Sequence, residues 1–255
     1  DITVTPLHIA FDEVCEKARQ RGLRVTGSEL VGLIPLQAML DAGRYFLQKQ
    51  QRSAGVADAE LIKIAVKSLG LDELAPFSSR ERIIEYLLED ESDKMLVSFP
   101  LKQFVEETAS ESAAPGGGSV AALAGALGAA LGTMVANLSA HKRGWDQRWE
   151  EFSGWAEKGK SYYEKLLKCV DEDTEAFNRV MEAFTLPKNN EQEKAIRKTA
   201  IREATLQAIQ IPLKVMQLAC ESMEVMRAMA QNGNPNSVSD AGVGALCART
   251  AVRGA

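Results

Sequence analysis

The sequence contains little of what metal sites and disulfide frameworks require. Its 255 residues include 2 histidines and 4 cysteines. The cysteines (Cys15, Cys169, Cys220 and Cys247) are far apart and form no CxxC pair. Zinc sites are usually built from closely spaced cysteines and histidines. The sequence therefore predicts no metal site, and it predicts free thiols in a reducing compartment, the cytoplasm.

Long runs of one charge are also absent. The formal net charge is -5, and 45% of the residues are hydrophobic. This balance is ordinary for a globular protein, and it argues against a nucleic-acid binder. No signal peptide opens the chain. The sequence starts without Met and stops at Ala255 inside an Ala-rich helical pattern, so we expect a piece of a longer protein.

The most distinctive stretch, residues 112–138, carries no charged residue and reads SAAPGGGSVAALAGALGAALGTMVANL. Small residues recur every fourth position and share one helical face, which suits close packing against another helix (Ala124, Gly128, Gly132 and Ala136). This pattern predicts a central core helix. A run of ~19 apolar residues could also cross a bilayer, but Asn137 lies within it and no aromatic belt flanks it, so we expect no membrane span.

The rest of the chain divides into three parts. Residues 1–50 combine two amphipathic helices with a strand-like passage at 23–35, whose partner strands are missing. Residues 51–94 contain two short helical patterns and indicate a linker. Residues 95–255 show only helical periodicity, with a break at Pro187 and a kink at Pro212 within a helix expected from about Glu191 to Met229. The predicted fold is mainly α: an antiparallel helical bundle preceded by a small α/β remnant.

Asp173 is the leading candidate for chemistry. It lies on an apolar stripe that runs from Phe152 to Phe184 and is expected to be buried, with Val170 and Phe177 one turn away on either side. A carboxylate facing a core is costly unless it is paired or functional. The alternative is a buried structural carboxylate. Asp171 and Asn178 lie seven residues apart on an adjoining face.

Three further groups could bind a ligand. The glycine-rich turn before the central helix could present free N–H groups to an anion or a polar ligand (Gly116, Gly117, Gly118 and Ser119), although such turns are often only turns. Asn234 supplies a side-chain amide close to Ser239 and Asp240 at a helix start, where Ser239 is the expected N-cap. Lys142 and Arg143 follow the central helix, where the helix dipole alone favours cations.

Several of these strings resemble one family. SAAPGGGSVAA, at the glycine-rich turn, is similar to the cyclodeaminase half of the formiminotransferase-cyclodeaminases. VTGSELVGLIPLQAMLDA, from Val25, resembles the end of their formiminotransferase domain. The resemblance covers essentially the whole chain. It implies a transferase remnant (1–50), an interdomain linker (51–94) and a cyclodeaminase bundle (95–255) that continues past Ala255.

The resemblance implies closure of 5-formimino-tetrahydrofolate to 5,10-methenyl-tetrahydrofolate with release of ammonia. The tetrahydrofolate derivative is the substrate, no cofactor is bound, and the family forms homo-oligomers. Through the motif DxDxxAF it favours Asp173 for the acid/base role, with Asp171 or Asp240 stabilising the cationic product. The glycine turn, Asn178, Asn234 and Ser239 would contact the substrate, and Lys142 and Arg143 would suit a polyglutamylated tail.

The last expectations concern the two histidines and two alternative functions. His8 is read as structural and His141 as non-catalytic, and no transferase activity is expected because the family's transferase histidine lies in a subdomain that this sequence does not contain. The alternatives are a methenyltetrahydrofolate cyclohydrolase, which reopens the same ring with water, and a non-catalytic helical module that only drives oligomerisation.

Overall fold

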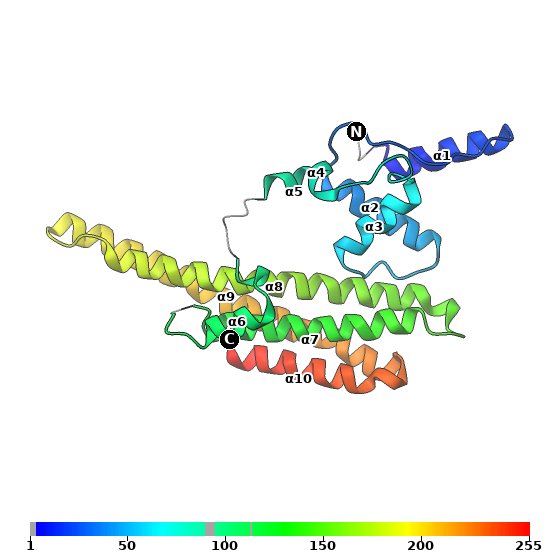
Figure 1. The fold of residues 1–255 in the computed structure, drawn as a ribbon. Coiled ribbons are helices and arrows are strands. Elements are labelled where there is room, and N and C mark those ends of the chain that lie inside the picture. The colour runs from blue at the N-terminus through cyan, green and yellow to red at the C-terminus, as the bar shows by residue number, and fades with distance from the viewer. Residues whose placement is uncertain (1–3, 90–94, 113) are drawn as a thin grey trace. The chain divides into compact units, whose positions relative to one another are not determined.

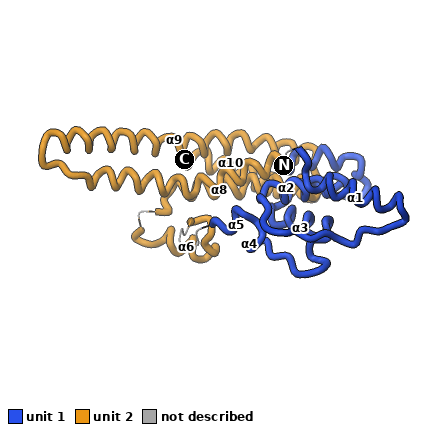
Figure 2. The backbone as a smooth tube through the Cα atoms, turned by 90° about the horizontal axis from the view of Figure 1, so that it is seen from above, with its two compact units in different colours: residues 1–92, 140–156 blue, residues 93–139, 157–255 orange. Residues whose placement is uncertain are grey.

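The computed structural model describes residues 4–89, 95–112 and 114–255, and helices dominate it (Figure 1). The chain forms two compact units (Figure 2). Unit 1 consists of Asp1–Ser92 and Ala140–Ala156, and unit 2 of Asp93–Ser139 and Glu157–Ala255. Each unit is therefore discontinuous in sequence, because a segment from the middle of the chain belongs to unit 1.

Unit 1 is built mainly around two helices of similar length, α2 and α3. Its helices are α1 (Leu7–Gln20), α2 (Leu36–Lys49), α3 (Asp58–Leu69), α4 (Ser79–Arg82) and α5 (Ile84–Leu88), with the short η2 (Asp146–Arg148) from the second segment. Met39, Leu61, Leu69 and Ile83 are fully buried in one hydrophobic cluster. Gly70 ends α3 in the left-handed conformation (φ 62°). Glycine is favoured at this position of a helix end because it has no Cβ.

The strand-like passage predicted at 23–35 does not form a strand in this chain. Within residues 4–89, β-type pairing is limited to one isolated parallel bridge, between Ile34 and Ile83. A strand needs neighbours to satisfy its backbone N–H and C=O groups. The described part of the chain supplies no such neighbours, so the passage stays extended without a sheet.

Unit 2 is the predicted helical bundle. It contains η1 (Leu96–Ser98), α6 (Leu101–Thr108), most of α7 (Gly117–Ala140) and α8 (Trp149–Thr185), α9 (Glu191–Asn232), η3 (Pro235–Ser237) and α10 (Val238–Gly254). Its core joins side chains from α7, α8, α9 and α10, among them Ala126, Leu166, Val215 and Ala251. α9 is a single helix with Pro212 inside it, as the sequence predicted.

α7 lies at the centre of unit 2, as the uncharged run predicted. Its glycines let the neighbouring helices approach so closely that a side chain would not fit between them. A methyl group on Gly128 would lie 2.6 Å from the carbonyl oxygen of Gly244 in α10, and one on Gly132 would lie 3.0 Å from the sulfur of Met226 in α9. A helix that is apolar all round is typical of such a central position.

α7 is also the one helix of the described residues that is long and apolar enough to cross a membrane. Its most apolar window has a mean hydropathy of 1.8, and 61% of that window is buried within the protein. The core helix of a globular bundle has these same properties, so the helix is weak evidence for a membrane span.

The four long helices differ in length, which corrects one prediction. α8 has 37 residues and α9 has 42, against 24 in α7 and 17 in α10. α8 and α9 consequently run on beyond the other two (Figure 1). The apolar stripe of α8 is buried at Phe152 and Val170, but Phe177 is 39% and Phe184 50% exposed, because the shorter helices do not reach them.

Candidate functional site

A groove lies where the start of α7 meets α8 and α9. It has a volume of about 700 Å³, which is in the range of small-molecule sites. We call it the glycine groove, and its lining includes Gly116–Gly118 of the turn, Asp173, Thr174 and Phe177 of α8, and Ile209 and Leu213 of α9. The last residue, Ala255, also lines it.

Asp173 lies at the polar end of this groove. Ser119 Oγ donates a hydrogen bond to Asp173 Oδ2 (2.9 Å) and lies 3.3 Å from Thr174 Oγ1. Gly118 allows the carboxylate to come this close, because a methyl group there would overlap Asp173 Oδ1 and lie 2.7 Å from its Cγ. The structure therefore brings together the glycine turn and the carboxylate that the sequence singled out separately.

The remaining walls of the glycine groove are mostly apolar. Phe177 and Val180 of α8 face Ile209, Leu213 and Met216 of α9. Flat heterocycles are usually bound between such walls, with a few polar groups that fix their orientation. Here the polar groups are the first N–H groups of α7, which no earlier turn of the helix can satisfy, and the Asp173 carboxylate.

Asp171 faces a different direction. Residues two apart on a helix point about 200° apart, and Asp171 Oδ1 accepts a hydrogen bond from the backbone N–H of Leu96 (2.6 Å). Asp171 is 9% exposed. Burial raises its pKa, although backbone N–H groups of Leu96 and Val97 oppose that shift. This carboxylate holds η1 against α8.

Asp171 also lines a second groove of about 740 Å³, which we call the charged groove. Lys214 pairs with Glu172 at 2.7 Å, and Arg179 lies 3.6 Å from Glu175. The charges of this groove therefore neutralise one another within the protein. It is slightly larger than the glycine groove, but it offers a ligand no comparable unpaired group. Asn178 is exposed on α8 and lines neither groove.

Asn234, Ser239 and Asp240 lie at the far end of unit 2. Asn234 donates its backbone N–H to Ser139 Oγ (2.8 Å) at the end of α7, and its side chain caps η3. Asp240 is in the first turn of α10, whereas the glycine groove is at the last turn, about 20 Å away at 1.5 Å per residue. Within one chain, these residues and Asp173 do not share a site.

The expected N-cap at Ser239 is wrong. α10 begins at Val238, one turn of 3-10 helix precedes it, and Ser237 occupies the N-cap position without a side-chain hydrogen bond. Ser239 is exposed within the first turn of the helix. The 3-10 turn at Pro235–Ser237 shifts the helix start two residues earlier than the Ser-Asp pair suggests.

Lys142 and Arg143 belong to unit 1 and do not line the glycine groove. The Lys142 ammonium lies 4.2 Å from the centre of the Trp145 ring, a favourable cation–π contact. His141 Nε2 accepts a hydrogen bond from the Ser53 N–H (3.2 Å). Burial and the nearby Arg52 lower the pKa of His141, which fits a neutral ring that accepts this bond.

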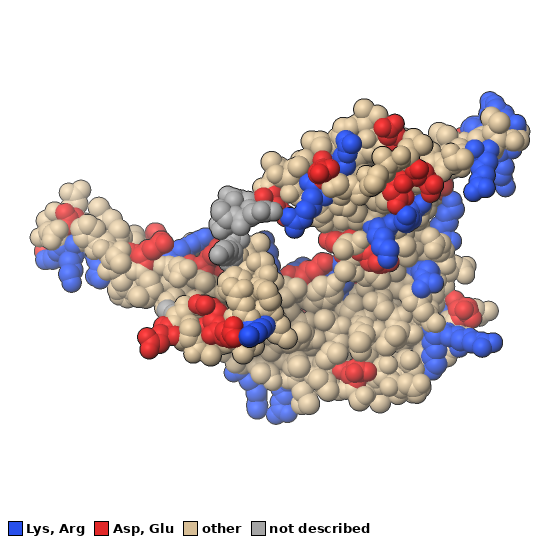
Figure 3. Space-filling view, in the orientation of Figure 1, with Lys and Arg blue, Asp and Glu red and all other residues tan. Residues whose placement is uncertain are grey.

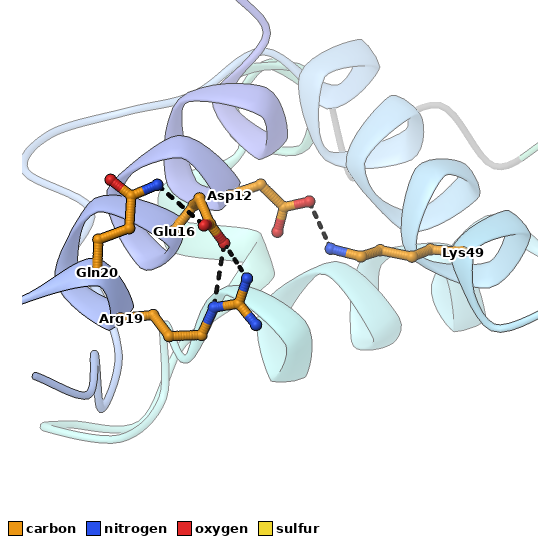
Figure 4. A network of polar contacts seen from close by, with 5 residues as sticks. All are labelled: Asp12, Glu16, Arg19, Gln20 and Lys49. Atoms are coloured by element: carbon orange, nitrogen blue, oxygen red, sulfur yellow. Dashed lines mark hydrogen bonds and ion pairs between the residues drawn. The ribbon is translucent and has the colours of Figure 1, made fainter. Parts of the chain in front are cut away.

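A second polar cluster joins α1 and α2 in unit 1 (Figure 4). Lys49 bonds to Asp12, and Glu16 accepts hydrogen bonds from Arg19 and Gln20. His8 is buried beside it, with its ring stacked on Tyr45 at 4.6 Å, and burial lowers its pKa. The charges are paired within the cluster, so it stabilises the contact between the two helices.

Sequence reasoning missed the α9 wall of the glycine groove and the role of Thr174. Ile209 and Leu213 are more than 30 residues from Asp173 and carry no motif. Thr174 adjoins a residue that was singled out, and a hydroxyl beside a candidate carboxylate was a signal that could have found it. No group of three or more His, Cys, Asp or Glu side chains in the described ranges is arranged to hold a metal ion.

Comparison with known proteins assigns both parts of the chain to families. Residues 100–255 match the family model described as formiminotransferase-cyclodeaminase, and residues 1–89 match that of the formiminotransferase domain. The chain belongs to the formiminotransferase-cyclodeaminase family. The resemblance read from the glycine turn and from the Val25 segment is thereby confirmed.

Individual relatives agree with this family. The formimidoyltransferase-cyclodeaminase of Gallus gallus is 40% identical over the whole chain, which spans 47% of that protein. The chain thus covers about half the length of the curated relatives it matches first. A methenyltetrahydrofolate cyclohydrolase of Methylorubrum extorquens is 37% identical over 61% of the chain and 74% of its own length.

One solved structure is also similar. The formiminotetrahydrofolate cyclodeaminase of Thermotoga maritima is 28% identical and superposes with a TM-score of 0.52, covering 60% of this chain and 73% of that one. Its likeness supports the same helical fold for unit 2.

Proposed function

We propose that the bundle is a formimidoyltetrahydrofolate cyclodeaminase, which converts 5-formimino-tetrahydrofolate to 5,10-methenyl-tetrahydrofolate and ammonia in histidine degradation and one-carbon metabolism. The observation that carries this is the Asp173 carboxylate, held against the glycine turn at the polar end of an apolar groove. The groove has the size and walls for a pterin ring. The names of the relatives support the reaction.

The reaction transfers only protons and an amine. The formimino group is an amidine, which carries a proton near neutral pH. N10 attacks its carbon and forms the N10–C bond, and Asp173 takes the proton that N10 loses. Asp173 then gives this proton to the exocyclic nitrogen, the C–N bond breaks, and ammonia leaves. The positive charge remains on the methenyl product, where a carboxylate stabilises it. We propose that no cofactor is needed beyond the folate substrate.

The role of Asp173 can be tested by replacing it. Asp173→Asn keeps the shape of the side chain but cannot take the N10 proton, so we expect turnover to fall by about a thousandfold or more while the protein stays folded. The measurement is methenyl-folate absorbance together with released ammonia, in the intact protein that carries this sequence. The matched control is Glu175→Gln, because Glu175 is an exposed carboxylate two residues along α8. Normal turnover in Asp173→Asn would refute the assignment.

The second candidate function is methenyltetrahydrofolate cyclohydrolase. The relative of that name is 37% identical and is covered over 74% of its length. The same assay separates the two activities. A cyclohydrolase consumes added methenyl-folate with water and releases no ammonia, whereas a cyclodeaminase produces the methenyl band and ammonia together. A purely structural helical module would give neither signal.

Residues 1–89 are proposed to be part of a formiminotransferase domain, in which the passage at 23–35 would join a sheet supplied by the rest of that domain. We propose no transferase activity for this stretch by itself.

The cytoplasm is the proposed compartment. All four cysteines are free thiols, so no disulfide contributes to the fold. Burial raises the pKa of the Cys169 thiol to about 11.

We further propose that the protein forms homo-oligomers through α7 and α10. Apolar side chains on these helices stay exposed: Leu127 (54%) and Leu138 (47%) on α7, Val243 (50%) and Leu246 (61%) on α10. This face carries few charged side chains (Figure 3). The small residues of α7 that suit close helix packing are used inside the chain, at Gly128 against Gly244.

A further inference from the structure

Ser119 and Thr174 form a short chain of hydroxyl groups that ends on Asp173. Ser119 Oγ is 2.9 Å from Asp173 Oδ2 and 3.3 Å from Thr174 Oγ1. A serine hydroxyl has one proton to donate and lone pairs to accept. An ionised carboxylate can only accept, so the Ser119 proton points to Asp173. Thr174 must then donate to Ser119, and the direction Thr174 to Ser119 to Asp173 is fixed.

The burial of these residues separates their roles. Ser119 has no exposed surface, so it cannot touch a ligand in the glycine groove. Thr174 is partly exposed and lines the groove. Since its proton is used toward Ser119, its oxygen remains able to accept a hydrogen bond from an N–H of a bound ligand. Ser119 can influence chemistry only through Asp173.

We infer that Ser119 and Thr174 act as a hydroxyl relay that orients the Asp173 carboxylate, an inference that rests on the proposed function. Ser119 is a positioning residue: it anchors Oδ2 and leaves Oδ1 to exchange protons with the substrate. Hydrogen bonds to the charged form of a carboxylate favour that form, and successive hydrogen bonds strengthen one another. The relay therefore keeps Asp173 ready to accept the N10 proton.

The test compares Ser119→Ala and Thr174→Val with the parent protein. For Ser119→Ala we expect kcat to fall by about tenfold or more, the scale of one hydrogen bond to a charged group, with KM changed by less than about twofold. The loss should fall on kcat and not on KM, because Ser119 orients the carboxylate without touching the substrate. Thr174→Val should lower kcat to a smaller extent, and Thr174→Ser, which keeps the hydroxyl, should keep the parent kcat.

Ser222→Ala is the matched control. Ser222 is also fully buried, but its hydroxyl donates to the Ala219 carbonyl of its own helix. This variant should keep the parent kcat and KM. If Ser119→Ala and Thr174→Val both keep the parent kcat while Asp173→Asn is inactive, the relay is refuted and the proposed function stands.

A readout without turnover keeps the relay testable if the proposed function fails. Crystal structures of the variants show where the Asp173 carboxylate lies. Ser119→Ala, or Thr174→Val if the former does not fold, should leave this carboxylate turned away from its parent orientation. An unchanged orientation would overturn the relay, whatever reaction the protein catalyses.

Discussion

Gly118 sets how closely Asp173 approaches the start of α7. A methyl group at Gly118 would overlap the carboxylate, whereas one at Gly117 would meet no atom within 4 Å. The two neighbouring glycines therefore differ in what they permit. Gly118 makes room for a side chain of the protein itself, and Gly117 leaves space open in the groove.

Gly118→Ala should lower kcat by about a hundredfold, because displacing a reacting group by about 1 Å has effects of this size. The fold should survive, since alanine is a better helix former than glycine. Gly117→Ala leaves Asp173 in place, so its effect should appear in KM. Steady-state kinetics of both variants checks this split. Equal kcat values for the two variants would contradict it.

At the scale of single residues, the sequence predicted Asp173 but not its partners. A carboxylate on an apolar stripe is visible in the sequence because it conflicts with its neighbours. The Ser119 contact is not visible, since 54 residues separate the pair. The cluster at Asn234 was grouped with Asp173 through the family resemblance, and only the path of α10 shows that one chain keeps these two residues apart.

Close helix contacts through glycine organise the bundle. A methyl group on Gly128 of α7 would lie 2.6 Å from the Gly244 carbonyl oxygen and 3.0 Å from the Ala248 nitrogen, both in the backbone of α10. Backbone atoms cannot move aside as a flexible side chain does. Gly242, also in α10, has open space where a methyl group would lie.

Gly128→Ala should therefore lower the free energy of unfolding by about 1–3 kcal/mol, the usual cost of overpacking, despite the better helix propensity of alanine. Gly242→Ala should raise it by up to about 1 kcal/mol for that same propensity. Denaturant unfolding of both variants measures the difference. Should Gly128→Ala prove as stable as Gly242→Ala, the close approach of α7 and α10 would be wrong.

The helices themselves follow from periodicity, and their ends show where it fails. The charge-free run of α7 was sufficient to predict a core helix. The apolar stripe of α8 predicted burial as far as Phe184, yet Phe177 and Phe184 are exposed because α7 and α10 are shorter, and only the small Ala176 and Ala183 are buried beyond Asp171. Helix length relative to its neighbours is a property of the assembled bundle, which local periodicity does not encode.

At the scale of the whole molecule, the exposed apolar face of α7 and α10 should bury itself against a second copy. The parent protein should have a mass in light scattering of at least twice that of one chain. Leu127→Glu places a charge in this contact and should raise the dissociation constant by at least about tenfold, because a buried unpaired carboxylate is costly.

Leu74→Glu is the control for this oligomer prediction. Leu74 is 82% exposed in unit 1, so a charge there should leave the mass unchanged. A monomeric parent protein, or a Leu127→Glu variant with the mass of the parent, would refute pairing through this face.

The discontinuity of unit 1 limits how the two parts of this protein can be separated by recombination. His141 and Ser153, from the segment between α7 and α8, accept hydrogen bonds from the backbone of Ser53 and Ala54. A recombination event that transferred residues 93–255 alone would carry His141 and Ser153 away from both donors. The transferase-like and bundle parts thus share a structural element, and shuffling at the linker would have to replace it.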